Sequence, residues 1–326
     1  MPLRSVTRIA LLSLVLAEGA GATERSADNE AYYGNYRVAE NHVLGINPFI
    51  TDAGEQVVFF ADYNSGVVGP LSRISGSRFR LGDRPSDLTI EFMRDDKGGQ
   101  VRGMRLQTEN QAAQLAEALP LRREEVAFPG TDAKLVGTLI SPATPGPHPA
   151  IVLLHGSGPL TRHSFGPYPH FFTSLGMAVL VYDKRGTGGS TGDGWETFLD
   201  GQGRLIESRS WFFQTRGQYS SVEQMQFDWD RILSFDPLPQ LALVKCPVLG
   251  VFGELDTSTP SARAAANMRR VLTEAQHKDV STIIFSNASH SLMELPSRKR
   301  MAPGVFEALR TWLRDRLFAS PTPAHP

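Results

Sequence analysis

Residues 149–159, PAIVLLHGSGP, join an unbroken apolar run to a glycine-rich turn. Five consecutive apolar residues followed at once by His155 and Gly156 predict a buried β-strand that ends in a tight loop. A second run of this kind, MAVLVYDKRG at 177–186, comes after a short helical segment, YPHFFTSLG at 168–176. Apolar strands separated by helices predict a mostly parallel sheet of the α/β class.

The same alternation extends to the C-terminal end of the sequence. Two further apolar strands are predicted, then amphipathic helices, and an antiparallel pair is predicted upstream. The strands are CPVLGVFGELD (246–256) and STIIFSNASH (281–290), the helices are PSARAAANMRRVL (260–272) and PGVFEALRTWLRDRLF (303–318), and the antiparallel pair is EEVAF (124–128) with KLVGTLISP (134–142).

Residues 31–107 have a different pattern. Apolar and polar residues alternate on both sides of Lys97-Gly98-Gly99, which is typical of a hairpin, so we expect a small antiparallel meander or partial barrel. The segment Thr108–Leu119 contains good helix formers and predicts a linking helix. We therefore divide the chain into a β-rich domain (23–120), an α/β domain (121–319) and a loose proline-rich tail (320–326).

The first 22 residues have the features of an export signal. Arg4 and Arg8 precede a short apolar run, Ile9 to Ala17, and Ala20-Gly21-Ala22 offers a small-x-small cleavage site. We expect an exported protein, periplasmic or secreted, with no membrane span after cleavage. A membrane anchor or a buried helix is the alternative.

Composition narrows the range of partners and redox chemistry. The formal net charge is −1, so nothing favours nucleic acid or an anionic membrane surface. The single cysteine, Cys246, excludes an intramolecular disulfide. Its apolar neighbours predict that it is a small buried side chain rather than a reactive thiol.

Four polar features follow the predicted strands, where open α/β sheets place their ligand sites. They are His155-Gly156-Ser157-Gly158-Pro159, Asp183-Lys184-Arg185-Gly186-Thr187-Gly188, Asp256 in GELDTSTP, and His290 in SNASHSLM. In the sequence of these motifs and in their order along the chain, residues 122–193 and 226–318 resemble the α/β-hydrolase superfamily. The resemblance is to exported bacterial esterase- or peptidase-like members that carry an additional N-terminal β domain.

The resemblance implies a serine hydrolase that acts on small carboxylic esters, or on amides or peptides, without a metal or an organic cofactor. Asp256 would be the acid that orients a histidine base, His290, and their order along the chain is that of this fold. His155, Gly156, Ser157 and Gly158 would form the oxyanion loop. We expect the charges of Lys184 and Arg185 to be solvated.

The nucleophile is the missing part. RGTGGSTGDG at 185–194 contains G-x-S-x-G centred on Ser190. However, a nucleophile elbow needs a strand running into the serine and a helix directly behind it, and Ser190 has neither. Ser157 and the pair Ser220 and Ser221 also lack this context.

The interval from Lys184 to Cys246 is too short for the strands, helices and cap of an intact relative, since one βαβ unit takes about 30 residues or more. Its aromatic residues predict one or two helices. We expect the sheet to close over the missing strand, so that 151–155 pairs directly with 248–252. The alternative to a hydrolase is an inactive, internally truncated remnant or a ligand-binding pseudoenzyme. A third reading is a binding module formed by the β domain.

Overall fold

The computed structural model describes most of the chain. The described residues are 9–13, 27–51, 55–82, 88–96, 99–109, 111–130, 132–156, 160–192, 198–199, 205–206 and 237–318. No helix among them is long and apolar enough to cross a membrane.

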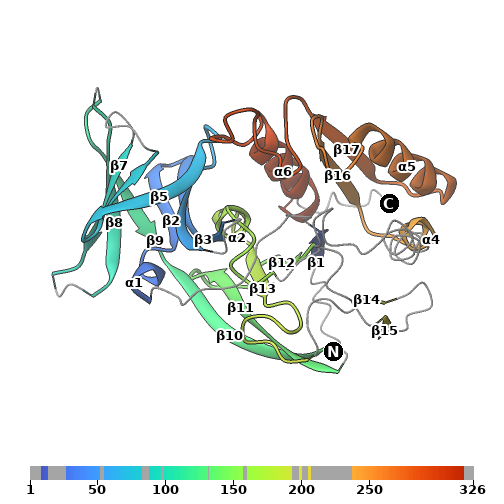
Figure 1. The fold of residues 1–326 in the computed structure, drawn as a ribbon, viewed down its shortest axis with the longest axis horizontal. Helices are drawn as coiled ribbons and strands as arrows, with labels where there is room; N and C mark the ends of the chain where they lie inside the picture. Colours follow the sequence, from blue (N-terminus) through green and yellow to red (C-terminus); the bar gives the residue numbers. More distant parts are fainter. Residues whose placement is uncertain are drawn as a thin grey trace, which may run out of the picture.

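The N-terminal domain is a closed barrel of eight antiparallel strands that comes after the short helix α1 (Ala27–Glu30) (Figure 1). Each strand pairs with the next one along the chain, and the last pairs with the first. The strands are β2 (Gly34–Ala39), β3 (His42–Ile50), β4 (Gln56–Asp62), β5 (Val68–Ser75), β6 (Arg78–Leu81), β7 (Thr89–Arg94), β8 (Val101–Gln107) and β9 (Gln114–Leu119). Alternate side chains fill the interior, among them Ile46, Phe79 and Met104.

The helix predicted for Thr108–Leu119 is wrong, because this segment contains strand β9. It pairs with both β8 and β2 and so closes the barrel. Its side chains alternate as in a strand, with Leu115 62% exposed and Ala116 1% exposed. The hydrogen bonds and burial gained by closing the barrel therefore outweigh the local helix preference.

Strand β1, which precedes the barrel, and four strands that follow it form a mixed five-stranded sheet in the order β1-β12-β13-β11-β10. Strands β10 and β11 form a long antiparallel hairpin, whereas β12 pairs in parallel with β13 and with β1. The bounds are β1 (Ile9–Ser13), β10 (Leu121–Gly130), β11 (Ala133–Pro142), β12 (Ala150–Leu154) and β13 (Ala178–Tyr182). The prediction of an α/β domain preceded by a small antiparallel β domain is confirmed.

Two more parallel strands, β16 (Val248–Gly253) and β17 (Val280–Phe285), form a separate sheet. The expected pairing of residues 151–155 with 248–252 is wrong, since the strand that completes β12 is β1, which pairs with it along its whole length. An unpaired edge of a buried strand is costly, and the N-terminal segment satisfies it. The two sheets share a hydrophobic core without sharing a ladder.

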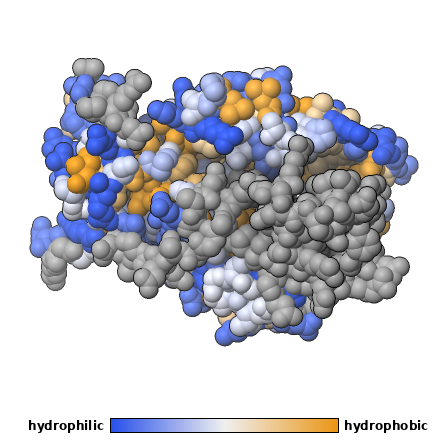
Figure 2. All heavy atoms as spheres, in the orientation of Figure 1, coloured by the Kyte–Doolittle hydropathy of each residue, from blue (hydrophilic) through white to orange (hydrophobic). Residues whose placement is uncertain are grey.

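Helices cover these sheets and connect their strands (Figure 1). Helix α5 is amphipathic, with Ala265 and Leu272 buried, while hydrophilic residues gather along the edge of the molecule where it lies (Figure 2). The bounds are α2 (Tyr168–Ser174), α4 (Leu238–Ala242), α5 (Ser261–Glu274) and α6 (Val305–Leu313), which a π-helical turn (Arg314–Phe318) extends; β14 (Phe198–Leu199) and β15 (Leu205–Ile206) form a two-residue ladder.

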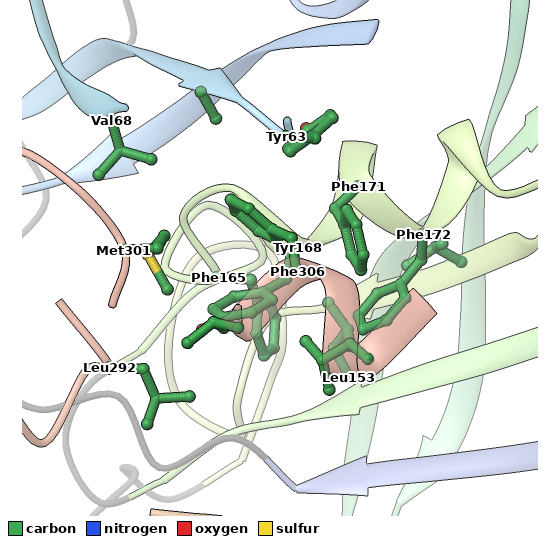
Figure 3. Close-up of a cluster of buried hydrophobic side chains, with 14 of the residues drawn as sticks. Tyr63, Val68, Leu153, Phe165, Tyr168, Phe171, Phe172, Leu292, Met301 and Phe306 are labelled. Carbon is green, nitrogen blue, oxygen red and sulfur yellow. The ribbon is translucent and has the colours of Figure 1, made fainter. Parts of the chain in front are cut away.

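The barrel and the α/β domain are joined by one core. Tyr63 and Val68 of the barrel pack in the same cluster as Phe171 of α2 and Phe306 of α6 (Figure 3). The Tyr63 ring lies edge-on to both phenylalanine rings, with centroids 5.3 and 5.2 Å away. Helix α2 is also hydrogen-bonded to the barrel, where Asn35 Nδ2 donates to Thr173 Oγ1 over 2.9 Å.

Candidate active site

Asp256 lies in the turn after strand β16. Its Oδ1 accepts hydrogen bonds from the backbone N–H groups of Ser258 and Thr259, at 2.7 and 2.9 Å. An aspartate that binds the backbone two and three residues ahead of it is typical of such turns. These two bonds fix the carboxylate and leave Oδ2 for a further donor.

That donor is His290. Its Nδ1 lies 2.7 Å from Asp256 Oδ2, and the two side chains are 16% and 5% exposed respectively. Because a carboxylate only accepts hydrogen bonds, the proton of the neutral ring lies on Nδ1, and Nε2 carries the lone pair. The structure thus brings together the two residues that the sequence pairs as acid and base.

Glycine at position 253 allows this encounter. A Cβ atom there would lie 2.1 Å from the Ser289 carbonyl oxygen and 2.5 Å from that of Ala288. Strand β16 therefore ends directly against the backbone that leads into His290. The bond from Leu255 N–H to the Ala288 carbonyl, 2.9 Å long, closes the contact.

The charge on Asp256 is stabilised in place. Burial alone would raise the pKa of this carboxyl group, but the hydrogen bond from His290 and those from the backbone of Thr259 and Ser258 together hold the pKa below its usual value of 3.8. The group is ionised near neutral pH, as a residue that orients an imidazole and stabilises an imidazolium must be.

The proposed oxyanion loop is described only at its start, since Ser157 and Gly158 lie outside the described residues. His155 Nε2 lies 2.5 Å from the Tyr182 carbonyl oxygen, and its ring stacks on Phe165 with centroids 4.5 Å apart. Burial lowers the pKa of His155 to about 4, so the ring is neutral. His155 thus anchors the end of β12 to β13.

The expectation that Lys184 is solvated is wrong. Its Nζ donates to the Gly156 carbonyl oxygen over 3.0 Å, and burial lowers its pKa. Lysine stems pack along apolar surface while the ammonium group reaches a polar partner. The segment after β13 therefore contacts Gly156 at the end of the described part of this loop.

A buried ion pair beside this loop was missed by sequence reasoning. Arg162 and Asp183, 6% and 2% exposed at their side chains, are joined in a bidentate manner, with NH2 2.7 Å from Oδ2 and Nε 3.1 Å from Oδ1. The backbone N–H groups of Arg162 and Gly189 also donate to the carboxylate, each over 2.8 Å. The sequence shows an aspartate after a strand, but nothing in it marks the arginine 21 residues earlier as its partner.

Ser190 has a structural environment. Its hydroxyl donates to the Asp183 carbonyl over 2.7 Å and accepts from the Val136 N–H over 2.9 Å. The residue is 9% exposed. These bonds tie the loop after β13 to β11, and they use the hydroxyl proton that a nucleophile would have to give to a base.

The remaining candidates fall in two groups. Ser157, Ser220 and Ser221 lie outside the described residues, as do most residues between 193 and 236, where helices are predicted. Cys246 is exposed, which corrects the prediction of a buried side chain, because it sits in the bend just before β16.

No metal cluster accompanies Asp256 and His290 in the described part of the chain. No three His, Cys, Asp or Glu side chains gather there in a way that could hold a metal ion. A cavity of about 110 Å³ lies at one end of the barrel. Its lining residues include His42, Phe60, Asp62 and Leu106.

Comparisons with known proteins give structural neighbours only. No family model matches the chain, and no curated protein matches it. An esterase of Pyrococcus furiosus shares 15% identity and a TM-score of 0.42, over 60% of this chain and 91% of the esterase. The acylaminoacyl peptidase of Pyrococcus horikoshii shares 15% identity and a TM-score of 0.42, over 86% of this chain and 55% of the peptidase.

A cold-adapted esterase from an Arctic intertidal metagenomic library shares 13% identity and a TM-score of 0.32, over 60% of this chain and 95% of the esterase. These neighbours are α/β-hydrolases, esterases and a peptidase. At TM-scores of this size the likeness assigns no role to any residue of this chain.

Proposed function

We propose that Asp256 and His290 are the acid and the base of a hydrolase that acts on small carboxylic esters. The observation that carries the proposal is the 2.7 Å bond between His290 Nδ1 and Asp256 Oδ2. Two backbone N–H groups fix the carboxylate from its other side. An imidazole held in this tautomer presents Nε2 to take a proton from a nucleophile.

The loop that begins at His155 and Gly156 would supply the second half of the chemistry. Attack on an ester carbonyl places negative charge on its oxygen, and backbone N–H groups of a glycine-rich loop are suited to stabilise it. Lys184 holds the described start of this loop through the Gly156 carbonyl. The proposed oxyanion loop comprises His155, Gly156, Ser157 and Gly158. Amides or peptides are the alternative substrates.

The second candidate function is ligand binding without turnover. The observation that favours it is the engagement of the Ser190 hydroxyl by Asp183 and Val136. Within the residues that the structure describes, the His290 ring is hydrogen-bonded to Asp256 alone. A site with an acid, a base and oxyanion donors but no positioned hydroxyl would bind an ester or its acid without cleaving it.

Hydrolysis of p-nitrophenyl acetate tests the proposal. We expect slow turnover that falls at least about 10-fold in His290→Ala and Asp256→Asn, since general-base catalysis contributes roughly 10²–10⁴-fold. His148→Ala is the matched control, because His148 lies in a loop where its Nε2 is 3.1 Å from the Thr144 carbonyl oxygen. Equal turnover by the wild type and His290→Ala would contradict a hydrolytic role for the pair.

A fluorophosphonate ester separates the two candidate functions, since it labels an activated serine covalently. Peptide mass analysis then identifies the serine. Labelling at Ser157, Ser220 or Ser221 would reveal the nucleophile, whereas saturable ester binding without labelling would favour the binding function. Ser190→Ala is expected to leave any labelling in place.

Export is the proposed cellular context. The charged n-region, the apolar run and the AGA sequence before Thr23 support it. Intact-mass analysis of exported protein tests it, and a mass that still includes Met1 would contradict it.

A further inference from the structure

We infer that the barrel positions the candidate base: the turn between β4 and β5, fixed by Asp62, holds the loop that carries His290. Asp62 is then a positioning residue that acts through the backbone of residues 299–301. This role rests on the proposed function, in which His290 is the base, but it can be tested without measuring enzymatic turnover.

Asp62 organises the turn in which it lies. Its Oδ1 accepts from the N–H groups of Asn64 and Ser65, at 2.9 and 3.2 Å, and its Oδ2 accepts from Ser65 Oγ at 2.7 Å. His42 Nε2 lies 3.0 Å from the same Oδ1 and links the turn to β3. Gly66 closes the turn with a φ of 78°, a left-handed conformation that favours glycine.

This turn is paired with a segment more than 230 residues away in the sequence. The N–H of Met301 donates to the Gly66 carbonyl over 2.8 Å, and the N–H of Val68 donates to the Lys299 carbonyl over 3.0 Å. Arg300 NH2 adds a bond of 2.7 Å to the Ser65 carbonyl. Figure 1 shows the loop before α6 lying against the barrel at this point.

The paired segment in turn holds the histidine loop. The Arg300 carbonyl accepts from the N–H of Glu294 over 2.8 Å, and Met293 and Met301 form an antiparallel bridge. The Met293 carbonyl accepts from the N–H of Ser289 over 2.9 Å, next to His290. Backbone hydrogen bonds therefore run without a gap from the Asp62 turn to the residue before His290.

Buried side chains pack along the same path as these hydrogen bonds. Val68, Met301 and Leu292 are 2%, 4% and 6% exposed, and Figure 3 shows them along one side of the shared core. Leu292 adopts a φ of 60°, so the chain reverses sharply just after His290. A reversal of this kind persists only when its surroundings hold it. The barrel supplies part of those surroundings.

Positioning of a base matters because catalysis is sensitive to its placement. A displacement of about 1 Å can cost roughly 100-fold in rate. Asp256 fixes one side of the imidazole through Nδ1, and the end of β16 and the 292–301 region together hold the backbone beside His290. The barrel thus contributes to the candidate site without touching a substrate.

The test compares three variants of the full chain. Asp62→Ala removes every bond that the carboxylate accepts, whereas Asp62→Asn keeps an oxygen for the two backbone donors and should rescue the position. Asp95→Ala is the matched control: Asp95 Oδ1 accepts from the Gly99 N–H over 2.8 Å in the β7–β8 turn, on the side of the barrel away from β16 and β17 (Figure 1).

Two readouts are used. Long-range ¹H–¹⁵N spectra of the imidazoles, assigned with His290→Gln, report the His290 tautomer. Hydrogen exchange reports amide protection in 289–302. We expect Asp62→Ala to lose the single Nδ1–H tautomer and to exchange at least about 10-fold faster there, while Asp62→Asn and Asp95→Ala behave as the wild type. If Asp62→Ala does not fold, Arg300→Ala, an exposed substitution, should show the same change with a smaller amplitude.

The outcomes separate the inference from the proposed function. A wild-type tautomer and wild-type exchange in Asp62→Ala would overturn the positioning role and leave the acid–base pair standing. A wild-type spectrum without the Nδ1–H tautomer would overturn the pair itself, and the inference with it.

Discussion

The surroundings of a single residue, Asp256, determine its ionisation state. Its pKa is held below 3.8, so the ionised form is favoured by folding. Because the pKa of Asp256 is lower in the folded than in the unfolded protein, the ionised carboxylate stabilises the folded state. This stabilisation is complete above the ordinary aspartate pKa and is lost as the pH falls through the lowered folded-state pKa. Below that pH a protonated Asp256 no longer attracts the His290 ring as a carboxylate does.

We therefore expect Asp256→Asn to reduce the free energy of unfolding most near neutral pH, and the difference from the wild type to shrink as the pH falls below 3.8. Urea unfolding over a pH series measures it. Asp132→Asn, at an exposed position, is the control. A difference that grows as the pH falls below 3.8 would contradict the lowered pKa.

The Arg162–Asp183 pair leads to a prediction about stability. Burial alone would raise the pKa of Asp183, but the bonds from Arg162 and the backbone lower it, so the carboxylate stays charged inside the protein. Arg162→Met leaves this charge buried without its partner and is expected to cost about 3–5 kcal/mol of unfolding free energy.

The control for this substitution is Arg270→Met. Arg270 and Glu274 form a pair that is 53% and 63% exposed on α5, and such pairs contribute about 0.5 kcal/mol or less. Denaturant unfolding of both variants gives the comparison. A cost for Arg162→Met as small as that for Arg270→Met would show that Asp183 is solvated or protonated.

Single residues of the candidate site can be predicted from the sequence where their position after a predicted strand is sufficient. Asp256 and His290 each come after an apolar strand, and parallel strands bring their carboxyl ends to one edge. Lys184 was misjudged because its environment depends on a segment far away in the sequence, and Cys246 because a bend before β16 leaves it exposed. The carbonyl that binds Lys184 belongs to Gly156, 28 residues earlier.

At the scale of elements, the end of β16 and the histidine loop form one unit around Gly253. Gly253→Ala would place a methyl group against two backbone carbonyls, which cannot rotate away as a side chain can. We expect a loss of about 1–3 kcal/mol and a weaker Asp256–His290 bond, seen as loss of the Nδ1–H tautomer.

Gly99→Ala provides the comparison for this prediction. A Cβ at Gly99 meets nothing closer than 3.7 Å, at Asp95 Oδ1. Its effect on unfolding should therefore be small. If Gly253→Ala were equally mild and kept the tautomer, the close approach at β16 would not be needed to form the pair.

Helices and strands can be predicted where the local residue pattern is sufficient. They cannot where closure of the barrel or completion of a sheet edge determines the structure. The hairpin of β10 and β11 and the apolar strands β12, β13, β16 and β17 match the alternation in the sequence. Strand β9 does not, because its helix-forming residues acquire their role only when the barrel closes. Which strand completes β12 likewise depends on residues more than a hundred positions away.

At the scale of the whole molecule, the two domains are interdependent. Phe59, Ala61, Tyr63 and Val68 of the barrel are buried in the same cluster as the strands and helices of the α/β domain. The Tyr63 hydroxyl donates to the Pro167 carbonyl over 3.1 Å, just before α2. A single core of this kind favours cooperative unfolding of both parts.

The N-terminal segment connects this architecture to the predicted export signal. Residues 9–13 pair in parallel with the whole of β12, whereas β13 pairs with only Ala150 to Val152. The same residues belong to the apolar run that is expected to be removed with the signal. Cleavage would therefore leave the outer edge of β12 without this partner, and exposed edges of apolar strands promote association.

We expect a chain that begins at Thr23 to show faster hydrogen exchange at residues 151–154 than the full chain, and more light scattering at equal concentration. Exchange in the β10–β11 hairpin, at the opposite edge of the sheet, should not change and serves as the internal control. Equal protection of 151–154 in both chains would mean that another segment takes the place of β1 once the signal is gone.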